Sequence, residues 1–307
     1  GGVSTWGGAA RDALTAKKHR FELARCWRAL LALPLSDALY HRALRALPAA
    51  VLPHVARPLQ FCDLLSDGYA RGGVDALLSL KGLFVLMQKH NLEYPRFYSR
   101  LYTLLSPGML DGEHRAEFAN ELQLFLSSTG LPVYLLAAFC KRLSRLALHG
   151  SPPAAALGLA LIFNLLLRHP AARVVVHAPR AGEPGAEAAA ARAIEAPPLD
   201  AAAPGAADPY LSDEEEPEKC HAVRSSLWEV DSLRAHYCPT VASLASLFAA
   251  PMTHATQPIP IEPMLDMSYR SLAQLETRKR LRSVPLNARP PLTPLCGDDG
   301  RKLAGWS

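Results

Sequence analysis

Apolar residues at helical spacing, in runs that each close on a helix-stopping residue, fill the first part of the chain from Lys17 to His90. Side chains three or four positions apart lie on one face of an α-helix, so each run predicts one helix with a buried face. The four predicted inward faces are Phe21, Leu23, Trp27, Leu30 and Leu31; Leu39, Leu44 and Leu47; Phe61, Leu64 and Leu65; and Leu77, Leu80, Phe84 and Met87. Helices this short are stabilised mainly by their neighbours, which predicts an irregular stack of antiparallel helix pairs.

Individual residues predict where these helices start and stop. Ser36 is placed to cap the second helix, and Pro58 suits the first position of the third. The glycine pair at 72–73 and Asn91 suit the end of a helix, where a left-handed residue is common.

The helix that follows Pro132 divides most sharply into two faces. Its apolar half is Leu135, Leu136, Phe139, Leu143, Leu146 and Ala147, and the opposite half carries Lys141, Arg142, Arg145 and His149 within an arc of about 100°. We predict that these four residues, the basic stripe, are exposed and contact rRNA phosphate or an acidic protein segment, whereas an ordinary solvated face is the alternative. Charge reversal at Lys141, Arg142 and Arg145 is then expected to weaken association without unfolding the domain.

The next helix, which Ser151 and Pro152 begin, is apolar on every side. Its apolar run from Ala154 to Leu167 is interrupted only by Asn164, with Gly158 counted as neutral. A membrane span needs roughly 20 such residues, so the run is too short to cross a bilayer. We therefore expect a buried helix in the middle of the fold and no membrane association.

Composition divides the chain into five parts. Residues 179–207 are rich in Ala, Pro and Gly and poor in large apolar side chains, so they cannot bury enough surface to offset the entropy of ordering. This predicts a helical core at 18–178, a disordered linker at 179–207, and a helical, proline-rich C-terminal segment of the same domain at 208–287. Residues 1–17 are expected to be flexible and 288–307 to form an atypical tail. The predicted fold class is all-α, an irregular HEAT/armadillo-like helical solenoid.

Charge and cysteine content say little about the cellular location and partners of the protein. The 307 residues are 50% hydrophobic, and 33 basic residues against 28 acidic ones give a net charge of +5. This mild excess fits an RNA-rich environment without requiring RNA contact. The six cysteines show no CxxC spacing, which favours reduced thiols and a cytosolic or nuclear location.

Candidate chemistry is sparse. The sequence contains no GxSxG element and no Walker lysine near its glycine pair, so we expect no catalytic residue, no cofactor and no small-molecule substrate. Cys220, His221, His236 and Cys238 are potential zinc ligands, but a helix roughly 20 Å long is expected to separate the two pairs, so no metal is predicted. Ser212 precedes the acidic run 213–216, which makes it either a target of an acidophilic kinase or a plain surface serine. The acidic run itself is expected to stay solvated or to dock a basic partner.

Several long stretches resemble one protein family. NLEYPRFYSRLYTLLSP (91–107), LPVYLLAAFCKRLSRLAL (131–148), LALIFNLLLRHP (159–170) and the region that begins DPYLSDEEEPEK (208–219) are similar to the nucleolar complex protein 4 family, which shares a domain with other nucleolar complex proteins and a CCAAT-binding-factor relative. The similarity runs from about Lys18 to Asn287 apart from the linker. The residues that match the central motif are Asn91, Glu93, Tyr94, Pro95, Phe97, Tyr98 and Leu101, followed by Leu131, Pro132, Tyr134, Ala137, Phe139, Lys141 and Arg142.

The resemblance implies a HEAT-like protein that is not an enzyme. Members of the family pair with nucleolar protein 14 and join the small-subunit pre-ribosomal particle, where they support 18S rRNA maturation. A nuclear and nucleolar location is therefore expected. A helical-repeat adaptor of the nucleus or cytosol with no ribosomal role is the alternative. The chain departs from the family in the region before Lys17, in a longer linker and in its last twenty or so residues.

Overall fold

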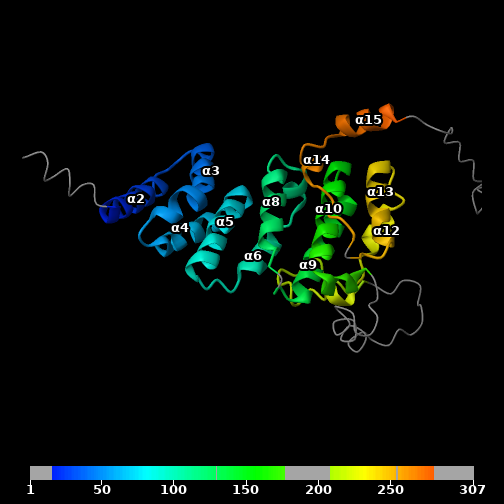
Figure 1. Ribbon diagram of the computed structural model, residues 1–307, viewed down its shortest axis with the longest axis horizontal. Coiled ribbons are helices and arrows are strands. Elements are labelled where there is room, and N and C mark those ends of the chain that lie inside the picture. The colour runs from blue at the N-terminus through cyan, green and yellow to red at the C-terminus, as the bar shows by residue number, and fades with distance from the viewer. Residues whose placement is uncertain (1–15, 129, 177–207, 254, 280–307) are drawn as a thin grey trace, which may run out of the picture. The chain divides into compact units, whose positions relative to one another are not determined.

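The computed structural model describes residues 16–128, 130–176, 208–253 and 255–279. Within these ranges all regular secondary structure is helical, which confirms the all-α prediction (Figure 1). The longer helices are α2 (Ala16–Leu31), α3 (Asp37–Ala46), α4 (Cys62–Ala70), α5 (Gly73–His90), α8 (Arg115–Phe125), α9 (Val133–His149), α10 (Pro152–Arg168), α13 (Pro239–Ser246) and α15 (Tyr269–Arg278). Shorter ones are α6 (Phe97–Thr103), α7 (Pro107–Asp111), α12 (Trp228–Leu233) and α14 (Glu262–Leu265).

Single turns of other helix types connect several of these helices. A π-helical turn covers Leu47–Val51, and 3₁₀ turns cover Leu52–His54, Pro58–Phe61, Pro170–Val175, Ala222–Arg224 and Leu247–Ala249. The chain divides into two compact units, residues 1–269 and 270–307, and the second is described only for residues 270–279, of which 270–278 belong to α15. The predicted flexible N-terminus, the linker 179–207 and the tail 288–307 lie largely or wholly outside the described residues.

Consecutive helices of the first unit pack on one another, as the predicted helical stack requires. Helix α4 packs on α5, α5 on α3 and α6, and α9 on α10. Most of the predicted helix ends also hold. Asn91 ends α5 in a left-handed conformation with φ of 51°, and Ser151 caps α10 by accepting a hydrogen bond from the Ala154 amide at 3.3 Å. Ser36 precedes α3 as predicted, but its hydroxyl makes no capping hydrogen bond.

Helix α10 is the centre of this unit, as its apolar sequence predicted. It contacts α7, α8, α9, α13 and α14, and nearly all of its side chains are buried. A Cβ atom added at Gly158 would lie only 3.1 Å from the Ala147 Cβ, so these two small residues allow α9 and α10 to approach closely. Among the described helices none is both long and apolar enough to cross a membrane.

The apolar face predicted for the first helix is mostly not buried. In α2 only Ala24 and Leu31 are buried, whereas Phe21 is 62% and Leu30 38% exposed. Leu39 of α3 is likewise 54% exposed, although Leu44 and Leu47 are buried as predicted. Helical spacing identifies an apolar face correctly, but burial also needs a second element to cover that face.

The C-terminal segment forms shorter helices than predicted. A single helix was expected between His221 and His236, but the chain instead forms a 3₁₀ turn, an extended residue at Ser225 and the short helix α12. A tertiary hydrogen bond explains the break. The Leu227 amide donates to the Val175 carbonyl at 3.0 Å, so it cannot donate to a carbonyl within a local helix. Helix α12 then packs on α9, and α13 packs on α10.

Candidate functional site

The basic stripe of α9 is the first sequence-predicted site, and its first residue, Lys141, is buried. The Lys141 side chain is only 1% exposed. Its ammonium group donates to the Ser226 carbonyl at 2.7 Å, and lies 2.8 Å from carboxylate oxygens of both Asp208 and Glu229. An ammonium has three donors, so these three partners satisfy it. The prediction that Lys141 is exposed is therefore wrong.

Arg145, one turn further along α9, completes a compact ionic cluster with Lys141, Asp208 and Glu229. The Arg145 Nε donates to Glu229 Oε1 at 3.0 Å, and its Nη2 donates to Asp208 Oδ2 at 3.1 Å. Glu229 is fully buried and also accepts from the Ser144 hydroxyl at 3.2 Å. Two cations thus face two carboxylates, and the cluster joins α9 to the segment that follows the linker.

Two aromatic rings cover the ionic cluster. The Tyr210 and Trp228 rings lie 5.8 and 5.2 Å from the Lys141 ammonium, within the range of cation–π attraction. The Trp228 indole also donates to Asp208 Oδ2 at 2.8 Å. Burial alone would raise the pKa of Asp208, but hydrogen bonds from Lys141, Ser225 and Trp228 outweigh it and hold that pKa well below its ordinary value. Asp208 therefore stays ionised and bound to its cations near neutral pH.

The other two residues of the basic stripe differ from each other. Arg142 donates from Nε to the Leu105 carbonyl at 3.1 Å, and its guanidinium lies over the Tyr102 ring at 4.5 Å. His149 is exposed at the end of α9. Helical spacing placed all four basic residues on one side of α9, but carboxylates and carbonyls from distant parts of the chain occupy most of that side. Charge reversal at Lys141, Arg142 and Arg145 is now expected to destabilise the domain, contrary to the prediction from sequence.

The first part of the family motif forms a helix end and a piece of the core. Asn91 ends α5, and Phe97 is buried between Phe84 and Phe125, with ring centroids 5.6 and 5.3 Å away. Tyr98 donates to the Phe125 carbonyl at 3.4 Å. Glu93 and Pro95 are exposed and Tyr94 is half-buried. The aromatic positions of the motif thus build the contact between α5, α6 and α8.

The second part of the motif builds the start and the centre of α9. Leu131 is half-buried, and Pro132 occupies the residue before the first helical turn. Phe139 is buried and meets the Tyr102 ring edge to face at 5.5 Å. The Tyr102 hydroxyl in turn lies 2.7 Å from the Tyr210 hydroxyl, so this core contact continues into the segment after the linker. Both parts of the motif therefore serve packing in the described structure.

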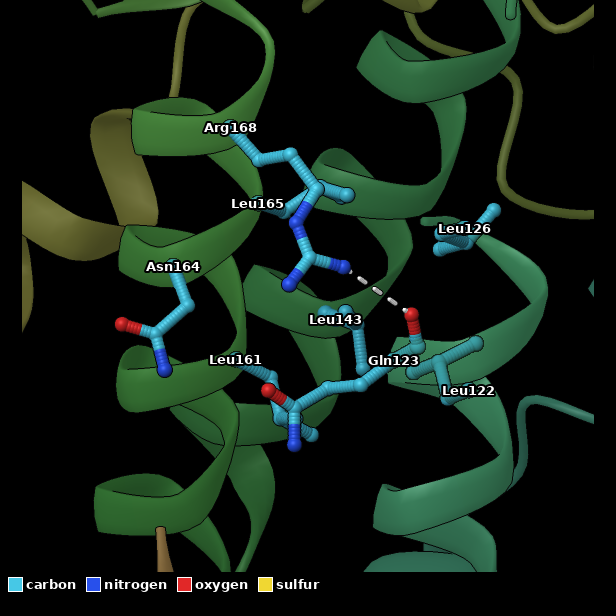
Figure 2. Close-up of a pocket in the computed structure, with 8 residues that line it drawn as sticks. All are labelled: Leu122, Gln123, Leu126, Leu143, Leu161, Asn164, Leu165 and Arg168. Atoms are coloured by element: carbon cyan, nitrogen blue, oxygen red, sulfur yellow. Dashed lines mark hydrogen bonds between the residues drawn. The ribbon is translucent and has the colours of Figure 1, made fainter. Parts of the chain in front are cut away.

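A small apolar cavity lies between α8, α9 and α10, with Leu143 and Leu161 among the residues that line it (Figure 2). Its volume of about 20 Å³ is room for a single water molecule, so it is no binding site for an organic ligand. Asn164, at its edge, donates to the Ile259 carbonyl and accepts from the Ile259 amide, both at 2.7 Å. The single polar interruption of the α10 sequence thus fastens the proline-rich segment to the core.

The possible zinc ligands do not form a metal site. Cys220 is buried with its thiol against the Pro217 carbonyl at 3.1 Å, and the His236 ring accepts from the Cys238 amide at 3.0 Å. Among the described residues, no group of three or more His, Cys, Asp and Glu side chains is placed to hold a metal ion. Burial also raises the pKa of the Cys140 thiol to about 12, so it is not a reactive nucleophile.

Asp208, Glu229 and Asn164 were not singled out as interacting residues by the sequence reasoning. Each bonds to a group that is 63 or more positions away along the chain. The sequence offered two signals: a charged residue beside a tryptophan, as in Trp228-Glu229, and one amide in an otherwise apolar helix. Neither signal indicates which residue is the partner.

The described structure thus defines a class of protein: an all-α stack of helices of the solenoid kind. The chain matches the model of the CBF/Mak21 family over residues 76–245, more than half of its length, and it belongs to that family.

The similar proteins bear the name expected from the sequence resemblance. Nucleolar complex protein 4 homolog A of Xenopus laevis is 39% identical over 275 residues, which cover 89% of this chain and 48% of the relative. The human nucleolar complex protein 4 homolog is 39% identical over 86% of this chain and 47% of its own, and an Arabidopsis thaliana relative is 38% identical over 89% and 48%. The chain spans about half the length of these relatives. Their names agree with the expected nuclear and nucleolar location.

Proposed function

We propose that this protein is a non-enzymatic assembly factor of nucleolar ribosome biogenesis. The observation that carries this proposal is the match to the CBF/Mak21 family together with identities of about 39% to nucleolar complex protein 4 homologs. The stack of helices supports it, because such stacks offer extended surfaces for binding other macromolecules. The polar groups of the ionic cluster bind one another and are not arranged around a reacting substrate.

The finer part of the proposal concerns the partner and the particle. The scaffold binds a nucleolar protein 14-type protein, holds it in the small-subunit pre-ribosome and supports maturation of 18S rRNA, as the resemblance to the family implies. Of the four residues in the basic stripe, His149 alone is kept as a candidate contact with the partner or with rRNA, because it is exposed. Lys141, Arg142 and Arg145 are assigned to internal support.

Co-sedimentation tests this proposal. A tagged chain is expected to migrate with pre-40S particles on a sucrose gradient, and its depletion is expected to change the level of 18S precursors. Absence from those particles together with unchanged precursors would favour the alternative, a helical-repeat adaptor with no ribosomal role. A pull-down with the nucleolar protein 14-type partner, followed by crosslink mapping, would identify the surface of contact.

A further inference from the structure

A polar cavity lies along α6, in the stretch of sequence that carries the first part of the family motif. We call it the α6 cavity. It has a volume of about 310 Å³, enough for one side chain or one small acidic group. It is lined by Tyr69, Arg96, Ser99, Arg100, Thr103, Glu215 and Glu216. Two arginines one helical turn apart and three hydroxyl-bearing residues, Tyr69, Ser99 and Thr103, thus share a single hollow with two carboxylates.

Arg100 is held in place by aromatic rings, but one of its donor nitrogens has no hydrogen-bond partner in the described structure. Its guanidinium carbon lies over two aromatic rings, 4.7 Å from the centre of Tyr69 and 4.8 Å from that of Tyr94. Cation–π attraction to two rings restricts the position of the guanidinium. Within the described structure, Arg100 Nη1 is buried and has no hydrogen-bond partner, and the same is true of the Tyr94 hydroxyl. Unmet buried donors are costly, so a native protein normally supplies an acceptor for them.

Arg96 is the accessible cation of the α6 cavity. Its side chain is 74% exposed, and its ion pair with Glu216 is a long one, with Nη2 at 3.6 Å from Oε1. Glu216 has a closer partner in Lys219, at 2.7 Å. The ion pair between Arg96 and Glu216 is therefore weak, so Arg96 can exchange Glu216 for another carboxylate at little cost in free energy.

Glu216 belongs to a closed acidic loop, residues 211–220. The Leu211 amide donates to the Cys220 carbonyl at 3.0 Å, so the two ends of the loop are joined. The run Asp213, Glu214, Glu215 and Glu216 lies within it, and two of these four residues reach the α6 cavity. One carboxylate of the chain itself therefore already stands beside an arginine of the cavity.

We infer that the α6 cavity binds an acidic side chain of a partner protein, and that Glu216 occupies its rim until the partner displaces it. A carboxylate is the natural acceptor for a planar guanidinium edge, since both have a forked geometry. A protein segment is favoured over RNA, because the group that already stands at the rim beside Arg96 is a side-chain carboxylate, that of Glu216. The inference adds partner chemistry to the proposed function and rests on it only in assuming that a scaffold binds a protein.

Fluorescence anisotropy with the purified full chain tests the inference. The probe is a fluorescent hexaglutamate peptide, and the controls are a hexaglutamine peptide and a fluorescent hexauridine RNA. We expect binding of hexaglutamate alone. Arg96→Ala should weaken it about tenfold, the loss of one charge-assisted hydrogen bond, and Glu216→Gln should strengthen it about threefold by removing the competitor. Arg42→Ala is the matched control, because Arg42 is exposed on α3 and its loss changes the net charge by the same amount.

Arg100→Lys examines the second cation, because it keeps the charge but loses the planar fork; it should also weaken hexaglutamate binding while the helical circular dichroism signal is unchanged. The inference is overturned by equal binding of hexaglutamine, by equal effects of Arg96→Ala and Arg42→Ala, or by Arg96-dependent binding of hexauridine in preference to hexaglutamate. No binding of any probe also overturns it. None of these results bears on whether the chain migrates with pre-40S particles, so the two proposals fail separately.

Discussion

Replacing Lys141 by methionine is the most direct test of the ionic cluster. The substitution keeps an unbranched side chain of similar length in the core but removes a cation that is 1% exposed. It removes one of two donors to the Ser226 carbonyl, which still accepts from the Ser225 hydroxyl at 3.1 Å, and Glu229, which is fully buried, keeps Arg145 and Ser144. The second cation of the cluster thus compensates for part of the loss.

The magnitude follows from the cost of breaking a buried ion pair by removing one partner, which is about 3–5 kcal/mol. Because Arg145 still pairs with Glu229, we expect the lower end, a decrease of about 3 kcal/mol in the free energy of unfolding. That is a large part of the about 5–15 kcal/mol that stabilises a typical folded protein. The matched control Arg42→Met removes an exposed cation and should change the free energy of unfolding by less than about 0.5 kcal/mol.

Urea unfolding followed by circular dichroism at the helical band measures both variants. The double variant Lys141→Met/Glu229→Gln closes a thermodynamic cycle, and we expect the two changes to be coupled by about 1–3 kcal/mol because the groups are in direct contact. If Lys141→Met were as stable as Arg42→Met, and the cycle were additive, the ionic cluster would not be what holds the segment after the linker on α9. The basic stripe would then again be available as a contact surface.

Three further outcomes test other parts of the structure. Because the pKa of Asp208 is lowered by folding, its contribution to stability is present above about pH 4 and is lost as pH falls further, so urea midpoints of the wild type and Asp208→Asn should differ by a constant amount between about pH 6 and pH 5 and converge as pH falls from about 4 towards 2. Asn164→Leu should leave both backbone groups of Ile259 unpaired, cost about 1–2 kcal/mol and speed amide hydrogen exchange at that residue, whereas unchanged exchange would contradict the assigned clamp. Iodoacetamide should alkylate Cys26, which is exposed, long before Cys140, which is buried with a raised pKa, as mass spectrometry of peptides from the native protein can check.

Local sequence rules predicted the helices well where each helix depends on its own residues. Asn91 and Ser151 end and begin helices as expected, since a left-handed residue and a capping hydroxyl act within one turn of the chain. The burial of α10 also followed from its sequence, because a helix that is apolar on every side has no stable position at a surface.

The same rules predicted burial less well, because a helix face is buried only where another segment packs on it. The apolar face of α2 was identified correctly, but Phe21 is 62% exposed because little of the described chain covers it. The helix expected between His221 and His236 is interrupted because the Leu227 amide donates to the Val175 carbonyl and not to a carbonyl of the same helix. Both differences come from contacts with residues that are distant in sequence, which periodicity does not contain.

The sequence by itself thus determined the fold class, the family and the grouping of Lys141, Arg142, Arg145 and His149 on one side of α9. Only the tertiary structure decided what that side faces, because Asp208 and Glu229 reach it from beyond the linker, 63 and 84 or more positions away. A side chain's spacing along a helix fixes its direction, whereas its burial and charge partner depend on which other segment packs there. For that reason the basic stripe, which was predicted to be a contact surface, mostly makes internal contacts. The stretch that carries the first part of the family motif also contains, at Arg96 and Arg100, the binding site we infer.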